Sequence, residues 1–257
     1  MNPLLQCKPT ILPLFIAGVL ACFGLLPKAL AVVPPPDGGY PGGNTAEGQN
    51  ALLSLTTGSF NTAVGWFSLS DNTTGNFNTA LGAGTLLYNI AESNTAIGAG
   101  ALLFNTTGEA NTASGTQALF SNDAGNANTA TGDAALYSNI EGSDNTASGT
   151  AALFFNTGSR NTASGRSALF DNTSGGDNTA TGYSALFNNT IGTFNTANGD
   201  QALFSNTEGA ANTAVGFRAL FDNTTGTHNT AIGSDTLVNN ISPWAFSPAA
   251  QSRMPTT

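Results

Sequence analysis

Charged side chains are scarce in this chain. Only 8% of its 257 residues are Asp, Glu, Lys or Arg, against roughly 25% in an ordinary globular domain. Six basic residues stand against fifteen acidic ones, and the formal net charge is −9. Nucleic acids and anionic membrane surfaces both attract basic patches, so this composition argues against either as a partner.

Cysteine and histidine are nearly absent as well. The two cysteines, Cys7 and Cys22, lie near the N-terminus, and the single histidine is His228. Catalytic triads, zinc sites and disulfide frameworks need several such residues in a fixed arrangement. The acidic residues fall mostly at variable turn positions, and the calcium-binding motif G-G-x-G-x-D does not occur. We therefore expect no enzyme activity, no cofactor and no metal site.

The first 31 residues have the features of a secretory signal peptide. Lys8 precedes a mostly apolar stretch over residues 10–26, and residues 29–31 (Ala-Leu-Ala) form a small-x-small cleavage site. One alternative is a transmembrane anchor, but Pro13 interrupts a stretch that is already shorter than the roughly 20 residues of a spanning helix. Another is a lipobox ending at Cys22. We expect cleavage after the triplet, no membrane span in the mature chain, and a secreted or cell-surface location.

From residue 44 to residue 240 the chain is a tandem repeat. Asn-Thr-Ala occurs twelve times, at a spacing of 17 residues except for two spacings of 16, after Asn78 and after Asn145. The unit is N-T-A-x-G-x-x-A-L-F-x-N-T-x-G-x-x, and its positions are numbered 1 to 17 below. Gly at position 5 and Leu at position 9 occur in every unit, and Asn at position 12 is missing only at Leu55. A repeat this regular determines the fold.

Two shorter segments flank the repeat. Residues 32–43 are rich in Pro and Gly and are predicted to form an irregular leader. Residues 241–257 are a C-terminal tail that contains Trp244 and Phe246. We expect the tail either to cap the last coil, whose open edge would expose unpaired backbone, or to be the remnant of a longer protein.

The repeat unit favours strands over helices. A fixed Gly, a frequent second Gly and two Asn residues interrupt every unit, and both types are poor helix formers and good turn formers. The runs T-A-x and A-L-F suit two short strands per coil, joined by turns at G-x-x and N-T-x-G. The sequence predicts an all-β parallel β-solenoid of about twelve coils, and a stacking distance of about 4.8 Å makes it a rod about 55 Å long.

Stacking gives the invariant residues structural roles. Asn in register above Asn is expected to form a ladder of side-chain amides, and Gly fits turns that require a positive φ. The candidate structural residues are the asparagines Asn61, Asn78, Asn94, Asn111 and Asn128, the leucines Leu119, Leu136, Leu153 and Leu169, and the glycines Gly115, Gly132 and Gly149.

Positions 9 and 10 place two large apolar columns next to each other. Position 9 is Leu, and position 10 is aromatic in most of the later units. Neighbouring residues on a strand face opposite sides, so one column fills the coil and the other faces outward. The sequence does not decide which. An outward stripe of this length exceeds the patch that a monomer normally exposes. We expect it to be buried between copies in a homo-oligomer. The alternative is a wide coil in which Ala at position 8 faces out and a bend brings both large residues inside.

The pattern N-T-A-x-G-x-x-A-L resembles the head repeats of trimeric autotransporter adhesins. The 17-residue unit with N-N-T-T-G turns is also similar to repeats of bacterial and phage tail-fibre-like surface proteins. The resemblance covers residues 44–240 and implies a left-handed β-roll, packed as a trimer at the bacterial surface. The sequence departs from these families in showing no coiled-coil stalk, membrane barrel or trimerising chaperone domain.

These observations predict an exported structural or adhesive surface rod that forms a homo-oligomer, with a trimer favoured. A surface glycan or a protein receptor is the candidate partner. The alternative function is a monomeric rod with a ligand-binding face for glycan or ice. Thr at position 2 recurs in all twelve units, but position 4 varies, which weakens the case for ice.

Overall fold

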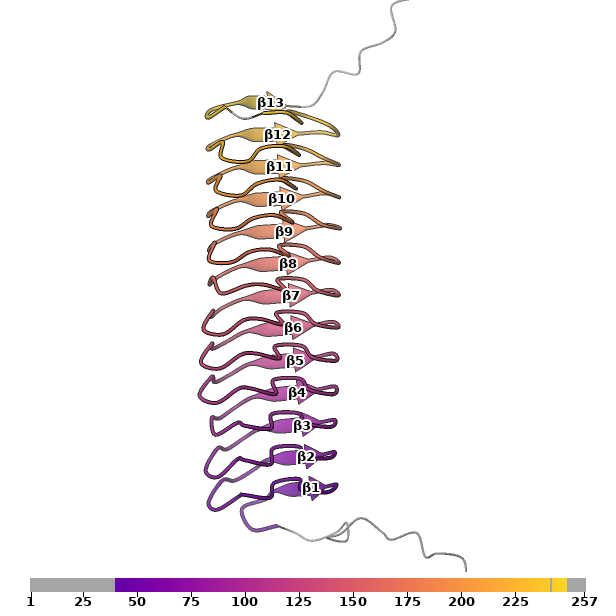
Figure 1. Cartoon of the computed structure of the whole chain (residues 1–257), viewed down its shortest axis with the longest axis vertical. Helices are drawn as coiled ribbons and strands as arrows, with labels where there is room; N and C mark the ends of the chain where they lie inside the picture. Colours follow the sequence, from indigo (N-terminus) through magenta and orange to yellow (C-terminus); the bar gives the residue numbers. More distant parts are fainter. Residues whose placement is uncertain (1–39, 241, 249–257) are drawn as a thin grey trace, which may run out of the picture.

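The structure is a computed structural model that describes residues 40–240 and 242–248. The expected signal peptide, most of the leader and the end of the tail lie outside the described residues. The described chain winds into a rod of stacked coils, and each coil contributes one strand to a single sheet (Figure 1). The predicted class, an all-β parallel β-solenoid, is confirmed.

Thirteen strands pair in sequence order, all in parallel. Twelve of them are the T-A-x segments of successive repeats, paired so that Thr lies beside Thr and Ala beside Ala. The strands are β1 (Thr45–Glu47), β2 (Thr62–Val64), β3 (Thr79–Leu81), β4 (Thr95–Ile97), β5 (Thr112–Ser114), β6 (Thr129–Thr131), β7 (Thr146–Ser148), β8 (Thr162–Ser164), β9 (Thr179–Thr181), β10 (Thr196–Asn198), β11 (Thr213–Val215), β12 (Thr230–Ile232) and β13 (Phe246–Pro248).

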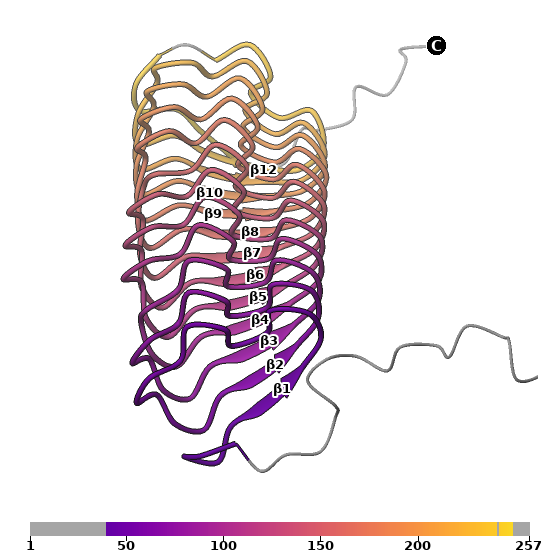
Figure 2. The ribbon, with the colours of Figure 1, turned by 60° about the horizontal axis from the view of Figure 1, so that its bottom comes forward.

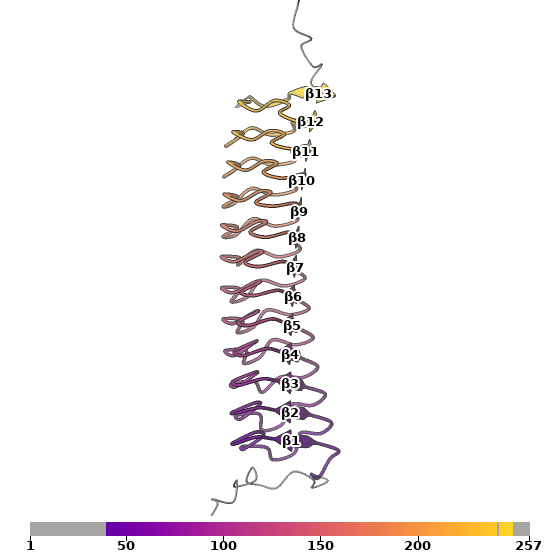
Figure 3. The ribbon, with the colours of Figure 1, turned by 90° about the vertical axis from the view of Figure 1, so that its right-hand side faces the viewer.

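The prediction of two strands per coil is wrong. The A-L-F segments are turns, because positions 7 and 9 adopt left-handed backbone angles, as at Gln117 (φ 55°) and Leu119 (φ 52°). An extended strand needs a strongly negative φ. The turns still bond to the next coil: the Leu119 amide donates to the Ala135 carbonyl, and the Ser121 amide donates to the Tyr137 carbonyl, each at 2.9 Å. Figure 3 shows the result, with the strands on one side of the rod and the turns on the other.

The irregular A-L-F backbone brings two neighbouring side chains into the core. Ala at position 8 and Leu at position 9 are both fully buried in most coils, together with Ala at position 3 of the strand. The aromatic residue at position 10 is half-buried on the outside. The leucine column therefore fills the coil and the position-10 column faces outward, and the wide-coil alternative with Ala at position 8 outside is wrong.

The two 16-residue coils lose their residue on the N-T-x-G side. In ordinary coils the side-chain amide of the position-12 Asn donates to a carbonyl three residues later, as Asn139 does to Gly142. In the short coils the acceptor comes two residues later, at Ala91 for Asn89 and at Gly158 for Asn156. The shortened turn keeps the same bond, so the register of the stacked coils is unchanged.

The C-terminal tail adds a thirteenth rung. Strand β13 pairs with β12, and the Trp244 ring stacks on the His228 ring with centroids 4.5 Å apart. The alternating pattern of parallel pairing directs the position-4 N–H of each strand toward the following coil. Position 4 of β13 is Pro248, which has no N–H. The described tail therefore covers the end of the repeat and offers one donor fewer to any further strand.

Candidate functional site

Two columns of buried asparagine side chains hold the stack together inside the coil. All the candidate asparagines at position 1 are buried. The Oδ1 of each accepts the backbone N–H of the next position-1 Asn, as Asn111 accepts from Asn128 at 3.0 Å. Its Nδ2 donates to the carbonyl of Gly at position 15 in the same coil, as Asn111 does to Gly125 at 2.8 Å. Each position-1 Asn thus closes its own coil and fixes the next one. Figure 2 shows the coils stacked on one another along the rod.

The strongest amide-to-amide ladder lies at position 12. Asn139 donates to Asn122 at 2.8 Å, and Asn156 donates to Asn139 at 2.9 Å. In the position-1 column the corresponding side-chain bond is longer, for example 3.1 Å from Asn128 to Asn111. The candidates named from the sequence include only position-1 asparagines. The recurrence of Asn in eleven of twelve units was the signal that could have added position 12.

The candidate glycines occupy a tight contact between coils. Gly115 has φ +144°, and a Cβ there would lie 2.3 Å from the carbonyl oxygen of Gly132. Gly132 and Gly149 have φ +133° and +135° and meet the next glycine in the same way. A side chain at position 5 would therefore separate the coils as well as strain the backbone.

The candidate leucines form the centre of the core. Leu119, Leu136, Leu153 and Leu169 are fully buried, each one rung from the next. The structure therefore brings the candidate asparagines, leucines and glycines into three parallel columns of one rod. None of the candidates forms a cleft for chemistry, and their role is to stabilise the fold.

Outside the core, seven aromatic rings at position 10 form an unbroken stack. Consecutive centroids are 4.9–5.2 Å apart and the ring planes differ by 3–13°. The guanidinium of Arg218 lies 4.5 Å from the last ring of the stack. The rings are half-buried, so their outer edges form a continuous apolar stripe. The stacked residues are Phe120, Tyr137, Phe154, Phe170, Phe187, Phe204 and Phe221.

The outer face of the sheet is divided into a polar centre and apolar flanks. Positions 2 and 4 of β1–β12 point outward, while Ala at position 3 points inward. In β5–β10 both outward positions carry Thr, Ser or Asn. On either side of this centre position 4 becomes apolar, at Val64, Leu81 and Ile97 and again at Val215 and Ile232, while the first strand carries Glu47 there. The variation at position 4 in the sequence is thus an ordered division of one surface.

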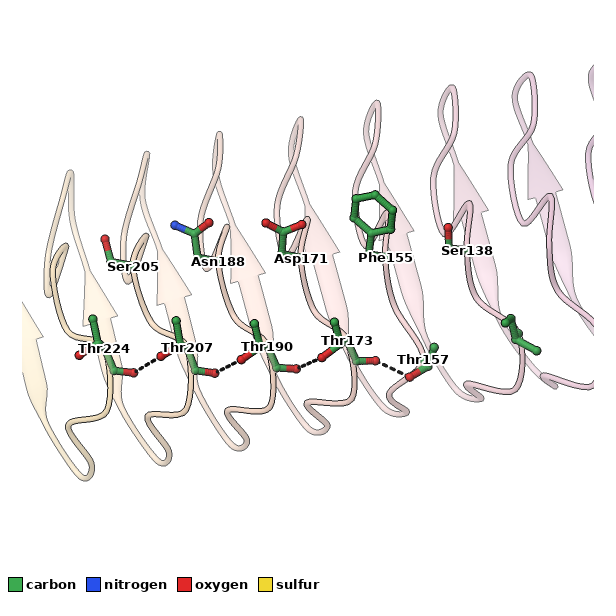
Figure 4. Close-up of a pocket in the computed structure, with 11 residues that line it drawn as sticks. Ser138, Phe155, Thr157, Asp171, Thr173, Asn188, Thr190, Ser205, Thr207 and Thr224 are labelled. Atoms are coloured by element: carbon green, nitrogen blue, oxygen red, sulfur yellow. Dashed lines mark hydrogen bonds between the residues drawn. The ribbon is translucent and has the colours of Figure 1, made fainter.

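A groove of about 840 Å³ runs along another face of the rod. It is lined by positions 11 and 13 of coils 6 to 11, on either side of the buried position-12 asparagines. Figure 4 shows the two rows, with the threonines Thr157 to Thr224 in one and Ser138, Phe155, Asp171, Asn188 and Ser205 in the other. Burial raises the pKa of the Asp171 carboxyl above its usual value.

Charge is sparse on the whole surface. The principal ion pair is between Arg160 and Asp177, with the guanidinium and carboxylate bonded at 2.7 and 2.9 Å. The hydrogen bond from Arg160 lowers the pKa of the Asp177 carboxyl.

No group of three or more His, Cys, Asp and Glu side chains that could hold a metal ion occurs among the described residues. The same part of the chain contains no helix long and apolar enough to cross a membrane.

Comparison with known proteins gives no match: no family model, no curated protein and no solved structure is significantly similar to this chain.

Proposed function

We propose that this chain is an exported structural or adhesive surface rod that assembles with copies of itself, with a trimer favoured. The observation that carries the proposal is the apolar stripe formed by the aromatic stack at position 10. Isolated exposed apolar side chains are common on monomers, but a continuous column along a rod is typical of a surface that becomes buried on association. The resemblance of the repeat to trimeric adhesin heads supports the same assembly.

A measurement of mass in solution tests the oligomer. The chain from residue 32 onward is purified and analysed by size exclusion with light scattering, and a trimer is the expected result. Replacing Phe154 and Phe187 with Gln within the stack should shift the mass toward the monomer. The matched control is Phe194→Gln, because Phe194 is 63% exposed and lies outside the stack. A monomeric wild-type protein at all concentrations would contradict the proposal.

A second candidate function is a monomeric rod whose sheet face binds an ordered surface such as ice. The observation in its favour is the polar centre of the sheet, where β5–β10 present two parallel rows of hydroxyl and amide groups. Strands in register repeat these groups at a constant spacing of about 4.8 Å. A thermal-hysteresis assay decides it: freezing-point depression that is lost on replacing Thr146 and Thr162 with Lys would support ice binding, and no hysteresis would remove it.

A further inference from the structure

The groove between positions 11 and 13 has two walls of different chemistry. On the threonine wall, four of the five Oγ1 atoms donate to the carbonyl of the threonine one coil further on. Thr173 donates to Thr190 at 2.8 Å, Thr190 to Thr207 at 2.9 Å and Thr207 to Thr224 at 3.2 Å (Figure 4). Because the hydroxyls are engaged with the backbone, this wall presents methyl groups to a ligand.

The opposite wall offers polar groups that the protein does not use. Among the described residues, no hydrogen bond is made by the side chains of Asp171 or Asn188, and Ser205 has only a long contact of 3.4 Å with Asp222. Phe155 stands in the same row with its ring 45% exposed. The groove therefore combines an apolar strip, a row of hydrogen-bonding groups and one exposed aromatic ring.

This combination excludes several kinds of occupant. An added peptide strand needs backbone N–H donors, but the amides of Asp171, Asn188 and Thr190 all donate to the next coil. An acyl chain would cover Asp171 and Asn188 without pairing them, which is costly for polar groups. The lining contains no Lys or Arg but does contain Asp171, so an acidic polymer has no counter-charge.

A sugar chain satisfies all three features. Each pyranose ring has an apolar C–H face and a rim of hydroxyls, and it stacks on exposed aromatic rings. We propose that the groove binds a linear, neutral glycan, with its hydroxyls on Asp171, Asn188 and Ser205 and its C–H faces on the threonine methyls and Phe155. This inference deepens the adhesive part of the proposed function, and it places recognition in a groove that borders the aromatic stripe, because the Phe155 ring meets the rings of Phe154 and Phe170 edge-on at 4.6 and 5.4 Å.

The groove also sets the length of the ligand. Its lining extends from coil 6 to coil 11, and rungs spaced by about 4.8 Å make it about 24 Å long. Affinity should therefore rise with the length of an oligosaccharide and stop rising once the chain fills the groove. A single sugar or a disaccharide should bind weakly.

Calorimetric titration of the purified protein with neutral cello-, chito- and malto-oligosaccharides of increasing length tests the proposal. We expect at least one series to bind with length-dependent affinity, and an acidic oligogalacturonate to bind weakly or not at all. No binding by any neutral series, or tighter binding of the acidic one, would overturn it. The mass of the same sample, measured separately, reports on the oligomer, so failure of one proposal is distinguishable from failure of the other.

Matched variants locate the site. Asp171→Ala and Phe155→Ala should each weaken binding about tenfold, which corresponds to about 1.4 kcal/mol. Asp71→Ala and Phe104→Ala change the same residue types at the same repeat position but outside the groove, and should leave affinity unchanged. Thr190→Val keeps the methyl group and should also preserve affinity. Equal losses in the groove and control variants would place binding elsewhere and contradict the assignment.

Discussion

The interior of each coil has two halves that are stabilised in different ways. One half is apolar and consists of Ala at positions 3 and 8 and Leu at position 9. The other is polar and consists of Asn at positions 1 and 12, bonded to each other and to Gly at position 15. Both halves are buried, but the first depends on volume and the second on matched donors and acceptors.

Position 8 of the apolar half and position 1 of the polar half differ in the substitutions they accept. Position 8 is Ser68 in coil 2 and Thr85 in coil 3, and these buried hydroxyls bond to each other at 2.9 Å and to nearby carbonyls. Position 1 is Asn in every coil, because its partner above and below is another position-1 Asn. Position 8 of the apolar half therefore tolerates local exchange, whereas Asn at position 1, like Ala at position 3 and Leu at position 9, occupies every rung.

The largest effect should follow from breaking the polar half at mid-rod. Asn139→Leu leaves the Asn122 oxygen without its donor and takes from the Asn156 amide one of its two acceptors, whereas the Gly142 carbonyl still accepts from Asn128. An unpaired buried group costs about 1–3 kcal/mol, and the other lost hydrogen bonds add to this, so we expect a loss of about 4 kcal/mol in the free energy of unfolding. Urea denaturation followed by circular dichroism measures it.

The natural exception at Leu55 supplies the control. Leu55 lies in the first coil, at the end of the position-12 column, where no earlier rung needs its amide. Leu55→Asn should therefore change stability by less than about 1 kcal/mol. Equal effects at positions 55 and 139 would show that the ladder contributes little to stability.

Breaking the apolar half should have a somewhat smaller effect. Leu136→Ala removes a fully buried side chain, and we expect a loss of about 3 kcal/mol from lost transfer energy and the cavity left behind. Leu53→Ala is the matched control, since Leu53 is 65% exposed. The same denaturation experiment compares the two, and a loss at Leu136 larger than at Asn139 would reverse the ranking of the two halves.

The outer aromatic stack is expected to contribute less than either half of the interior. Phe170→Ala removes a half-buried ring that stacks on Phe154 and Phe187 at 5.1 and 5.0 Å. We expect a loss of about 1.5 kcal/mol, including the gain specific to aromatic pairs. Phe194→Ala is the control for an exposed ring. If the stripe is buried in an oligomer, the loss at Phe170 should grow with protein concentration.

Surface charge should have the smallest effect, and its pH dependence has a definite sign. The pKa of Asp177 is lowered by Arg160, so its contribution to stability is present above the unfolded-state pKa and is lost as the pH falls through the folded-state pKa. The pKa of Asp171 is raised by burial, so its effect has the opposite sign: stability falls as the pH rises through the raised pKa.

NMR titration of the carboxyl groups checks both directions. In Arg160→Gln, the pKa of Asp177 should return toward its usual value, while that of Asp171 should not change. Thermal stability should hardly change, because exposed ion pairs contribute little. An unchanged pKa of Asp177 would show that the bidentate contact is not maintained in solution.

The same division of the coil explains how far the sequence could predict the structure. The 17-residue period of the repeat and its residue types account for three features: the T-A-x strand, the inward Ala at position 3 and the positive φ at Gly115. The prediction of a strand at A-L-F is wrong. Aromatic residues such as Phe favour strands, but Leu119 has a left-handed φ of 52°. Burial of the side chain and backbone hydrogen bonds to the next coil stabilise a leucine in this conformation. The conformational preference of the residue itself does not include these two contributions.

The groove could not be predicted from residue types alone. Its walls come from positions 11 and 13, and position 11 is among the most variable of the unit, with Ser138, Phe155, Asp171 and Asn188 in successive coils. The order emerges only when the coils are stacked. The polar centre of the sheet face likewise does not follow from any single unit, because its pattern at position 4 spans several repeats.

Almost all hydrogen bonds between coils join residues 15 to 18 positions apart in the chain. Each coil therefore forms hydrogen bonds only with the coil before it and the coil after it, and these neighbours have nearly the same sequence. Recombination between repeats in the gene could add or remove whole rungs and leave the asparagine, glycine and leucine columns continuous. The length of the rod is thus a quantity that evolution can adjust in single steps, without any redesign of the interior.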